Sequence, residues 1–228
     1  MKHDLLMALN AARSEGRLIV RAVDLTSGEE QLIDPESDAS PLGIAAADAA
    51  RADQSRPAEI PGQTWFLTVY NPPLDLVIVG AVHIAQPLSR MAQLAGYGVR
   101  VIDPRTAFAT SERFPGVTLS HDWPDDALAK TPLGSRSALV ALTHDPKVDD
   151  RALSAALRSK CFYIGALGSK KTHAGRRDRL AQHGFSQREL DRIHGPIGLA
   201  IGARSPAEIA IAILAEMTQL LRLPPRAI

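Results

Sequence analysis

Cysteine is nearly absent from this chain: Cys161 is the only one among 228 residues. An internal disulfide is therefore excluded, and this composition is typical of proteins in the reducing cytoplasm. The chain also lacks any run of the roughly 18 to 20 apolar residues that a membrane-spanning helix needs. Its formal net charge of +1 provides no broad electrostatic attraction to nucleic acid. We expect a cytoplasmic protein that has neither a membrane nor a nucleic acid as a partner.

The first residues of the sequence do not predict a secretory signal. Residues 1–7 contain Asp4 and no apolar segment that leads to a small-residue cleavage site. What the chain does have is an apolar content of 45%, which is enough to bury a substantial core without disulfide or metal staples. The length allows one or two domains.

Residues 1–73 show the pattern of a small α+β domain. Apolar residues at helical spacing predict a helix over residues 2–14. Alternating, β-branched and aromatic residues predict three strands, the first two forming a hairpin, over residues 18–23, 31–33 and 65–70. Residues 34–61 are rich in proline and predict a loop, a short helix over residues 44–52 and a second loop.

Residues 74–228 alternate between strands and helices, which predicts a parallel sheet covered by helices on both faces. The predicted strands are residues 76–80, 99–103, 138–143 and 162–165. The predicted helices are residues 84–95, 125–129, 149–158 and 170–183. A last helix follows Ser205, which caps it together with Pro206 and Glu208. The predicted fold class is α/β: a Rossmann-like doubly wound parallel sheet with a smaller N-terminal α+β segment.

The strand at residues 76–79 runs into the turn Gly80-Ala81-Val82-His83, which predicts the start of a dinucleotide-binding unit. The G-x-G-x-x-G/A fingerprint has a glycine where Val82 stands, and the branched side chain of Val82 would crowd a phosphate. His83 is either an anion contact at the start of a helix or a surface histidine. Asp103 follows the next strand, where it either accepts hydrogen bonds from a ribose or caps the turn after it.

Thr143, His144 and Asp145 follow another predicted strand and fall on the same edge of the sheet. His83 and His144 suit binding a metal, relaying a proton or contacting a phosphate, although neither has partners at metal-ligand spacing. Asp145 precedes Pro146 and has the alternative role of a turn former.

The segment from Gly165 to Thr172 follows the next strand and leads into a helix. Its glycines, Gly165 and Gly168, free the backbone, and Ser169 and Thr172 offer hydroxyl donors that suit a phosphate, although the P-loop spacing is absent. The helix that follows is made basic by Lys171, Arg176, Arg177 and Arg179, and a solvated helix face is the commoner meaning of such a run.

Two further features have mainly structural interpretations. The glycine-rich segment His194–Arg204 is either a tight structural loop or a wall of the binding cleft. Cys161 lies beside a predicted strand, so we expect a buried, inert thiol rather than a nucleophile.

Taken together, these motifs resemble the Rossmann-like C-terminal domain of the xanthine dehydrogenase accessory family (XdhC/CoxI). The resemblance runs from Phe66 to Glu216. It is carried by Leu76–Pro87, Val101–Arg105, Glu112–Pro115, Leu142–Asp150, Phe162–Ser169 and His194–Glu216. The chain departs from the family at Val82, where a second glycine is usual, and in residues 1–75, which lack the family's glycine- and cysteine-containing segment.

The resemblance implies a cytoplasmic maturation factor, more a chaperone than an enzyme. Such a protein binds a molybdopterin-type molybdenum cofactor and inserts it into the apoenzyme of a xanthine dehydrogenase-type molybdenum hydroxylase. A homodimer, a cysteine desulfurase and a separate cysteine-containing family member are the other implied partners. The cofactor-binding residues carried over are Gly80, His83, Asp103, Thr143, His144, Asp145, Gly165, Gly168, Ser169 and Thr172.

No residue is assigned as catalytic or as a metal ligand. Two alternatives to the chaperone remain open from the residues. One is an NAD(P)-binding oxidoreductase, because the glycine turn and Asp103 are parts of a nicotinamide site. The other is a non-catalytic interaction module that has kept the fold and lost its ligand.

Overall fold

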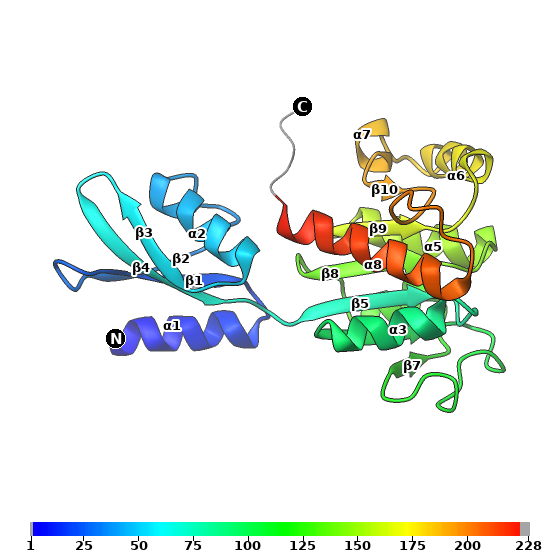
Figure 1. The fold of residues 1–228 in the computed structure, drawn as a ribbon, viewed down its shortest axis with the longest axis horizontal. Coiled ribbons are helices and arrows are strands. Elements are labelled where there is room, and N and C mark those ends of the chain that lie inside the picture. Colours follow the sequence, from blue (N-terminus) through cyan, green and yellow to red (C-terminus); the bar gives the residue numbers. More distant parts are fainter. Residues whose placement is uncertain (1, 224–228) are drawn as a thin grey trace. The chain divides into compact units, whose positions relative to one another are not determined.

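The computed structural model describes residues 2–223. Met1 and residues 224–228, which the sequence assigns to the first and the second predicted domain, lie outside the described residues. The chain divides into two compact units, Met1–Pro72 and Pro73–Ile228 (Figure 1). Among the described residues, no helix is both long and apolar enough to cross a bilayer.

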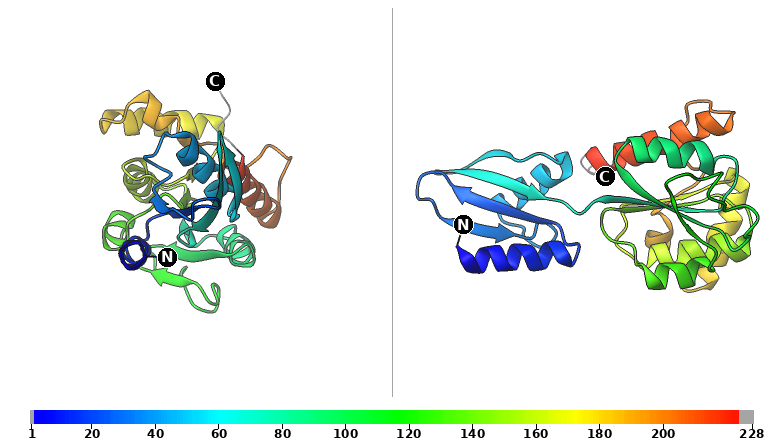
Figure 2. Two further views of the ribbon diagram at one scale, coloured as in Figure 1. Left: turned by 90° about the vertical axis from the view of Figure 1, so that its left-hand side faces the viewer. Right: turned by 90° about the horizontal axis from the view of Figure 1, so that it is seen from below.

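The first unit is a four-stranded antiparallel sheet with a helix on each face (Figure 2). The strand order is β2-β1-β4-β3. Its elements are α1 (His3–Ser14), β1 (Ile19–Asp24), β2 (Glu30–Ile33), α2 (Pro41–Ala52), β3 (Arg56–Ile60) and β4 (Gln63–Tyr70). Val20 and Leu67 pack under Ala46 of α2, whereas the neighbouring Ile19 packs with Leu9 of α1. The two faces follow from the alternation of side chains along a strand.

Strand β3 forms where the sequence pattern predicts a loop. It pairs with β4 from Arg56 opposite Leu67 to Ile60 opposite Gln63 and lies at the edge of the sheet. Pro57 breaks the usual strand pattern, but an edge strand tolerates a proline because one row of its main-chain groups needs no partner strand. The prediction of a loop at residues 56–60 is therefore wrong, because this segment lies at the edge of the sheet, where a proline is compatible with a strand.

The second unit is a six-stranded parallel sheet in the order β10-β9-β8-β5-β6-β7, which is the strand order of Rossmann dinucleotide-binding folds. The elements are β5 (Leu74–Val79), α3 (Ala85–Leu94), β6 (Tyr97–Ile102), β7 (Thr118–Ser120), α4 (Pro124–Lys130), β8 (Ser137–Ala141), α5 (Pro146–Leu157), β9 (Tyr163–Ala166), α6 (Lys170–Gln182), α7 (Gln187–Leu190), β10 (Ile193–His194) and α8 (Pro206–Arg222). The predicted fold class is confirmed.

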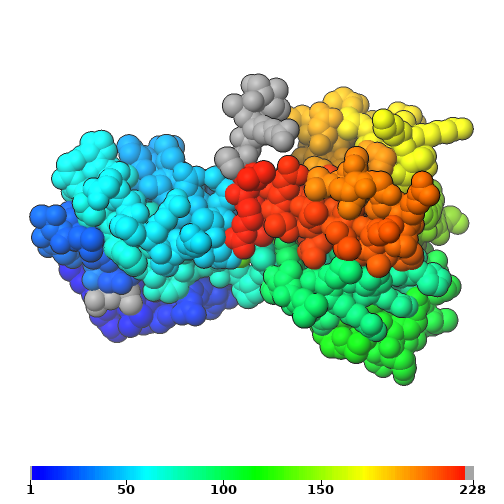
Figure 3. Space-filling view, in the orientation of Figure 1, coloured from blue at the N-terminus to red at the C-terminus, as the bar shows by residue number. Residues whose placement is uncertain are grey.

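Helices cover both faces of this sheet, and β5 lies in its middle (Figure 2). Leu76 and Ile78 point into a core cluster with α3 and α8, which lie side by side on one face (Figure 3). Val77 and Val79 point into a second cluster with α4 and α5. The continuous apolar run of β5 exists because both faces of the strand are buried.

Local signals place most of the helix ends. The predicted capping box of α8 is present, with Ser205 accepting from Glu208. Helix α5 begins at Pro146, three residues before its predicted start, because the Asp145 carboxylate accepts from the N–H of Lys147 and caps the helix. Strands β7 and β10 were not predicted, since segments of two or three residues show no periodicity.

Candidate functional site

The candidate site lies at the carboxyl ends of the central strands, where the order of the parallel sheet reverses between β5 and β8. Ligands of open α/β sheets bind at this kind of switch point. The N–H of Leu142 donates to Val79 O and the N–H of Leu167 donates to Ala141 O, each at 2.9 Å. The turns that follow β5, β8 and β9 are therefore neighbours along one edge.

Gly80 brings the turns after β5 and β8 into close contact. Its φ is +106°, and a Cβ placed on it would lie 2.6 Å from Thr143 Cγ2. Only glycine fits such a backbone without strain. Val82, which replaces the expected second glycine, packs its side chain against the core under α3 and α8. His83 is exposed in the turn that precedes α3 rather than in the helix itself.

Asp103 holds this turn from the neighbouring strand β6. Its carboxylate is fully buried and accepts from the N–H of Ala81 and from the main chain and guanidinium of Arg105, at 2.8 to 3.0 Å. Burial alone raises the pKa of Asp103, but these hydrogen bonds outweigh it and hold the pKa below its usual value. Both oxygens are occupied, so the structure supports the turn-capping role and not the ribose contact.

Arg105 is a residue that the sequence did not single out. Its side chain is 43% exposed beside the Gly80 turn, and the guanidinium also lies 4.6 Å over the ring of Phe108. The signal that could have found it is its spacing of two residues from a strand-end aspartate.

The turn after β8 is closed on itself by two carboxylates. Asp149 accepts from Thr143 Oγ1 at 2.6 Å and from the N–H groups of Thr143 and His144 at 3.2 Å. Asp145 accepts from the N–H of Lys147 at 2.9 Å, and its own N–H donates to Thr143 Oγ1. These bonds leave the start of α5 with acidic partners, so its main chain is a poor anion site.

His144 has the left-handed backbone conformation, with φ of +64°. Its side chain is exposed at the same edge of the sheet. Residues other than glycine adopt this conformation rarely, and it clusters at functional sites. The turn therefore fixes the backbone of His144 at this edge.

A buried ion pair lies beneath this turn. The Arg176 guanidinium of α6 is 3.6 Å from Asp149 and donates to Leu167 O at 2.9 Å. Burial raises the pKa of Asp149 despite the hydrogen bonds from Thr143. Arg176 is only 2% exposed, so its interpretation as part of a solvated basic face is wrong: its side chain points back toward the start of its helix and under the preceding loop.

The third turn joins β9 to α6 and presents the start of a long helix. Ser169 Oγ accepts from the N–H of Thr172 at 3.1 Å and lies 3.0 Å from its hydroxyl. Gly168 has φ of +141° and packs against Thr172. Gly165 lies inside β9, where a Cβ would come within 2.5 Å of Ile197 Cδ1. Gly165 thus makes room for protein rather than for a ligand.

Two sets of main-chain donors remain available at this edge. Within the part of the chain that the structure describes, the N–H groups of Val82, His83 and Ile84 and those of residues 168–171 make no hydrogen bond. Both sets stand at the positive end of a helix, α3 and α6 respectively, which is the ordinary arrangement for binding an anion. No group of three or more His, Cys, Asp or Glu side chains in residues 2–223 is arranged to hold a metal ion.

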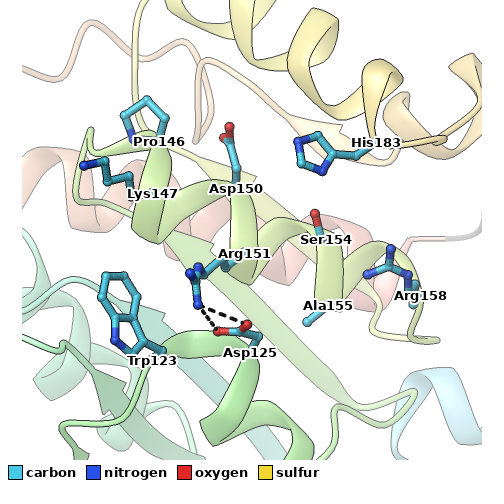
Figure 4. Close-up of a pocket in the computed structure, with 10 residues that line it drawn as sticks. All are labelled: Trp123, Asp125, Pro146, Lys147, Asp150, Arg151, Ser154, Ala155, Arg158 and His183. Carbon is cyan, nitrogen blue, oxygen red and sulfur yellow. Dashed lines mark hydrogen bonds and ion pairs between the residues drawn. The ribbon is translucent and has the colours of Figure 1, made fainter.

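A groove of about 480 Å³ lies on the outer side of α5 and holds none of the predicted site residues (Figure 4). Arg151 reaches Asp125 at 3.3 Å and stacks 4.6 Å over the ring of Trp123. Asp150, on the same side of the helix, pairs with Arg179 at 2.6 Å. The aspartates that line the groove are therefore neutralised by arginines.

The glycine-rich segment after His194 is anchored to α8 by Glu216. This carboxylate accepts from Tyr163 Oη at 2.6 Å and from the N–H of Gly198 at 2.8 Å, and it lies 3.2 Å from His194 Nδ1. The contacts support the structural interpretation of the segment. Cys161 is buried as predicted, and burial raises the pKa of its thiol.

The strand order and the parallel sheet covered by helices on both faces define a Rossmann-like domain. Residues 76–217 match the XdhC Rossmann domain, and the chain belongs to the XdhC family. The resemblance found in the sequence is thereby confirmed.

Three relatives illustrate the relationship. The chain is 32% identical over 155 residues to a Bacillus subtilis protein named as a probable xanthine dehydrogenase subunit, covering 68% of this chain and 45% of that protein. It is 30% identical over 151 residues to the molybdenum cofactor insertion chaperone PaoD of Escherichia coli, covering 66% and 41%. A crystal structure from Bacillus halodurans, described as a xanthine dehydrogenase (BH1974), matches with a TM-score of 0.69 at 27% identity, over 95% of this chain and 66% of that one. The chain spans less than half the length of the two curated relatives from Bacillus subtilis and Escherichia coli.

Proposed function

We propose that this chain binds the molybdenum cofactor as cargo and inserts it into a xanthine dehydrogenase-type molybdenum hydroxylase. Membership of the XdhC family and the similarity to a protein named as a molybdenum cofactor insertion chaperone support a maturation factor. In the same proposal the chain works in the cytoplasm as a homodimer. A cysteine desulfurase and a separate cysteine-containing family member assist it.

The observation that carries the proposal is that two helices, α3 and α6, begin at one sheet edge with main-chain N–H groups that make no hydrogen bond within the described residues. Molybdopterin offers a phosphate and a bicycle rich in donors and acceptors. The free N–H groups at the start of α6, with the Ser169 and Thr172 hydroxyls beside them, suit the phosphate. His83 and His144, both exposed at this edge, suit the polar remainder of the cargo.

Four of the other predicted site residues, Gly80, Thr143, Asp145 and Gly168, shape the turns that present these groups. Gly80 and Thr143 form the contact between two turns, and Gly168 packs against Thr172. Asp145 caps α5. The chain's own part in the chemistry is to bind, orient and shield the cargo, and no proton or bond transfer is assigned to a side chain.

The nicotinamide alternative is disfavoured by one contact. A nicotinamide site uses its strand-end acid to bind the ribose, and the Asp103 carboxylate is buried under four hydrogen bonds from Ala81 and Arg105. Titration with NAD(H) and NADP(H) should therefore give no binding at millimolar concentration.

The decisive experiment uses molybdenum cofactor released from a purified molybdenum hydroxylase under exclusion of oxygen. The purified chain should retain it, as seen by native mass spectrometry, and should raise the activity recovered by a cofactor-free xanthine dehydrogenase. Failure of both would end the proposal. Retention that appears only after Val82→Gly would favour the degenerate interaction module.

One variant tests the main chain directly. Lys170 is the first helical residue of α6, where proline removes an N–H yet suits the helix, and Ser169 before it already has the extended conformation that proline requires. Lys170→Pro should weaken retention roughly tenfold relative to Lys170→Ala, which removes only the charge. Equal retention by the two variants would exclude the start of α6 as the anion site.

A further inference from the structure

The buried pair Asp149 and Arg176 connects two of the turns at the candidate site. Asp149 belongs to the first turn of α5 and Arg176 to the middle of α6. Nη2 of the guanidinium lies 3.6 Å from Asp149 Oδ2 and donates to Leu167 O at 2.9 Å. The Arg176 guanidinium thus contacts both the turn after β8, through Asp149, and the turn after β9, through Leu167 O.

Asp149 passes this constraint to His144. It accepts from the N–H of His144 at 3.2 Å and from the N–H and hydroxyl of Thr143. His144 at the same time has φ of +64°, a conformation that costs free energy in a residue with a Cβ. Contacts around the turn must offset that cost. One of them, the hydrogen bond from the N–H of His144 to Asp149, is made by His144 itself.

Stability alone is a poor explanation for this pair. Its closest approach of 3.6 Å is longer than a hydrogen bond, and Nε and Nη1 of Arg176 have no hydrogen-bond partner among the described residues. A buried ion pair of imperfect geometry is often replaceable by apolar side chains without loss of stability. What such a replacement removes is the geometry that the charges impose.

We infer that Asp149 and Arg176 are positioning residues, which hold His144 in its left-handed conformation and fix the turn after β8 against the turn after β9. The cofactor part of this inference rests on the proposed function, because His144 and Ser169 then face one cargo together. The conformational part stands without it.

The neighbouring pair Asp150 and Arg179 provides a matched control. It also joins α5 to α6, with a distance of 2.6 Å. Asp150 faces the groove on the outer side of α5 (Figure 4), and the carboxylate that Thr143 and His144 contact is Asp149. The same chemical change can therefore be made one residue along the helix.

The test compares Asp149→Leu/Arg176→Met with Asp150→Leu/Arg179→Met in protein labelled with ¹³C-histidine. The Cα and Cβ chemical shifts of His144, assigned by their loss in His144→Gln, report its backbone conformation. We expect them to leave the left-handed range in the first double variant and to stay in the second. Retention of molybdenum cofactor released from a purified hydroxylase should fall about tenfold or more in the first variant alone.

A folded Asp149→Leu/Arg176→Met protein with unchanged His144 shifts would overturn the inference, as would an equal change in the control. If the wild-type chain retains no cofactor, the proposed function fails while the His144 shifts still decide the positioning role. If the first double variant does not fold, Asp149→Asn takes its place. It keeps an acceptor for Thr143 Oγ1 and removes the charge, and unchanged His144 shifts there would overturn the inference equally.

Discussion

The N–H of Ala81 donates a 2.8 Å hydrogen bond to the buried carboxylate of Asp103. The end of strand β6 thereby holds the turn that follows β5. The acid that a nicotinamide enzyme would use for its ribose serves here to shape the protein.

Asp103→Asn should lower the free energy of unfolding by about 2 to 3 kcal/mol. The neutral amide keeps one acceptor oxygen, but its NH2 group replaces the other oxygen and cannot accept from the N–H groups around this buried site. Urea denaturation measures the loss. Arg105→Gln is the control and should cost only about 1 kcal/mol, since Asp103 keeps the main-chain donors of Ala81 and Arg105. Equal losses in the two variants would contradict the role of the carboxylate.

Gly80→Ala should destabilise the chain by at least about 1 kcal/mol more than Gly96→Ala. Both glycines have positive φ, but a Cβ on Gly80 meets Thr143 Cγ2 at 2.6 Å and a Cβ on Gly96 meets no described atom within 4 Å. Adding Thr143→Ser removes the methyl group and should restore part of the stability of Gly80→Ala. Thermal unfolding of the three proteins is the measurement, and no rescue by serine would show that the contact is not the cause.

His144→Gly should raise the free energy of unfolding by up to about 1 kcal/mol, because glycine adopts the left-handed conformation without the cost of a Cβ. The same variant should retain less molybdenum cofactor, since the imidazole is lost. Asp53 also has positive φ, at 58°, and lies in the other unit. Asp53→Gly should leave retention unchanged, and a drop there would point to a general effect of the substitution.

Glu216 should make the free energy of unfolding of the second unit depend on pH in the acidic range. Burial alone raises the pKa of its carboxyl group, but hydrogen bonds from His194, Tyr163 and the N–H of Gly198 outweigh it, so the pKa lies below the ordinary 4.5. The ionised carboxylate therefore stabilises the fold above the unfolded-state pKa, and the contribution is lost as the pH falls through the folded-state value.

The matching variant is Glu216→Gln. Its deficit in unfolding free energy relative to the wild type should be full near about pH 6 and should narrow toward about pH 3. Urea denaturation across this range measures it, and Tyr163→Phe, which removes one donor of three, should show a smaller change. A deficit that widens on acidification would contradict the sign of the shift.

Local chemistry made much of this fold predictable. The capping box of Ser205 and Glu208 lies within four residues, and the continuous apolar run of β5 indicates a strand that is buried on both faces. Both features were therefore predicted from the sequence. Strand β3 was not, because its pairing with β4 overrides the presence of Pro57. Strand β10 depends wholly on pairing with β9.

The candidate site was less accessible to sequence reasoning. The sequence indicates that Asp103 and Thr143 lie at strand ends, but whether such a side chain faces a ligand or the protein depends on neighbours distant in the chain. Arg176 sits in a basic helix whose composition resembles a solvated face, and its burial follows from the approach of Asp149 and Leu167. Long-range packing, which no local pattern encodes, decides these roles.

Many of the available donors at this edge are main-chain N–H groups, at Val82–Ile84 and at residues 168–171. Alanine scanning would overlook them, because it removes side chains and leaves every N–H in place. For the same reason relatives can change the side chains of these turns and keep the same set of donors, as Val82 illustrates with its side chain turned into the core. Divergence of sequence in the glycine turn is therefore a poor measure of divergence in ligand.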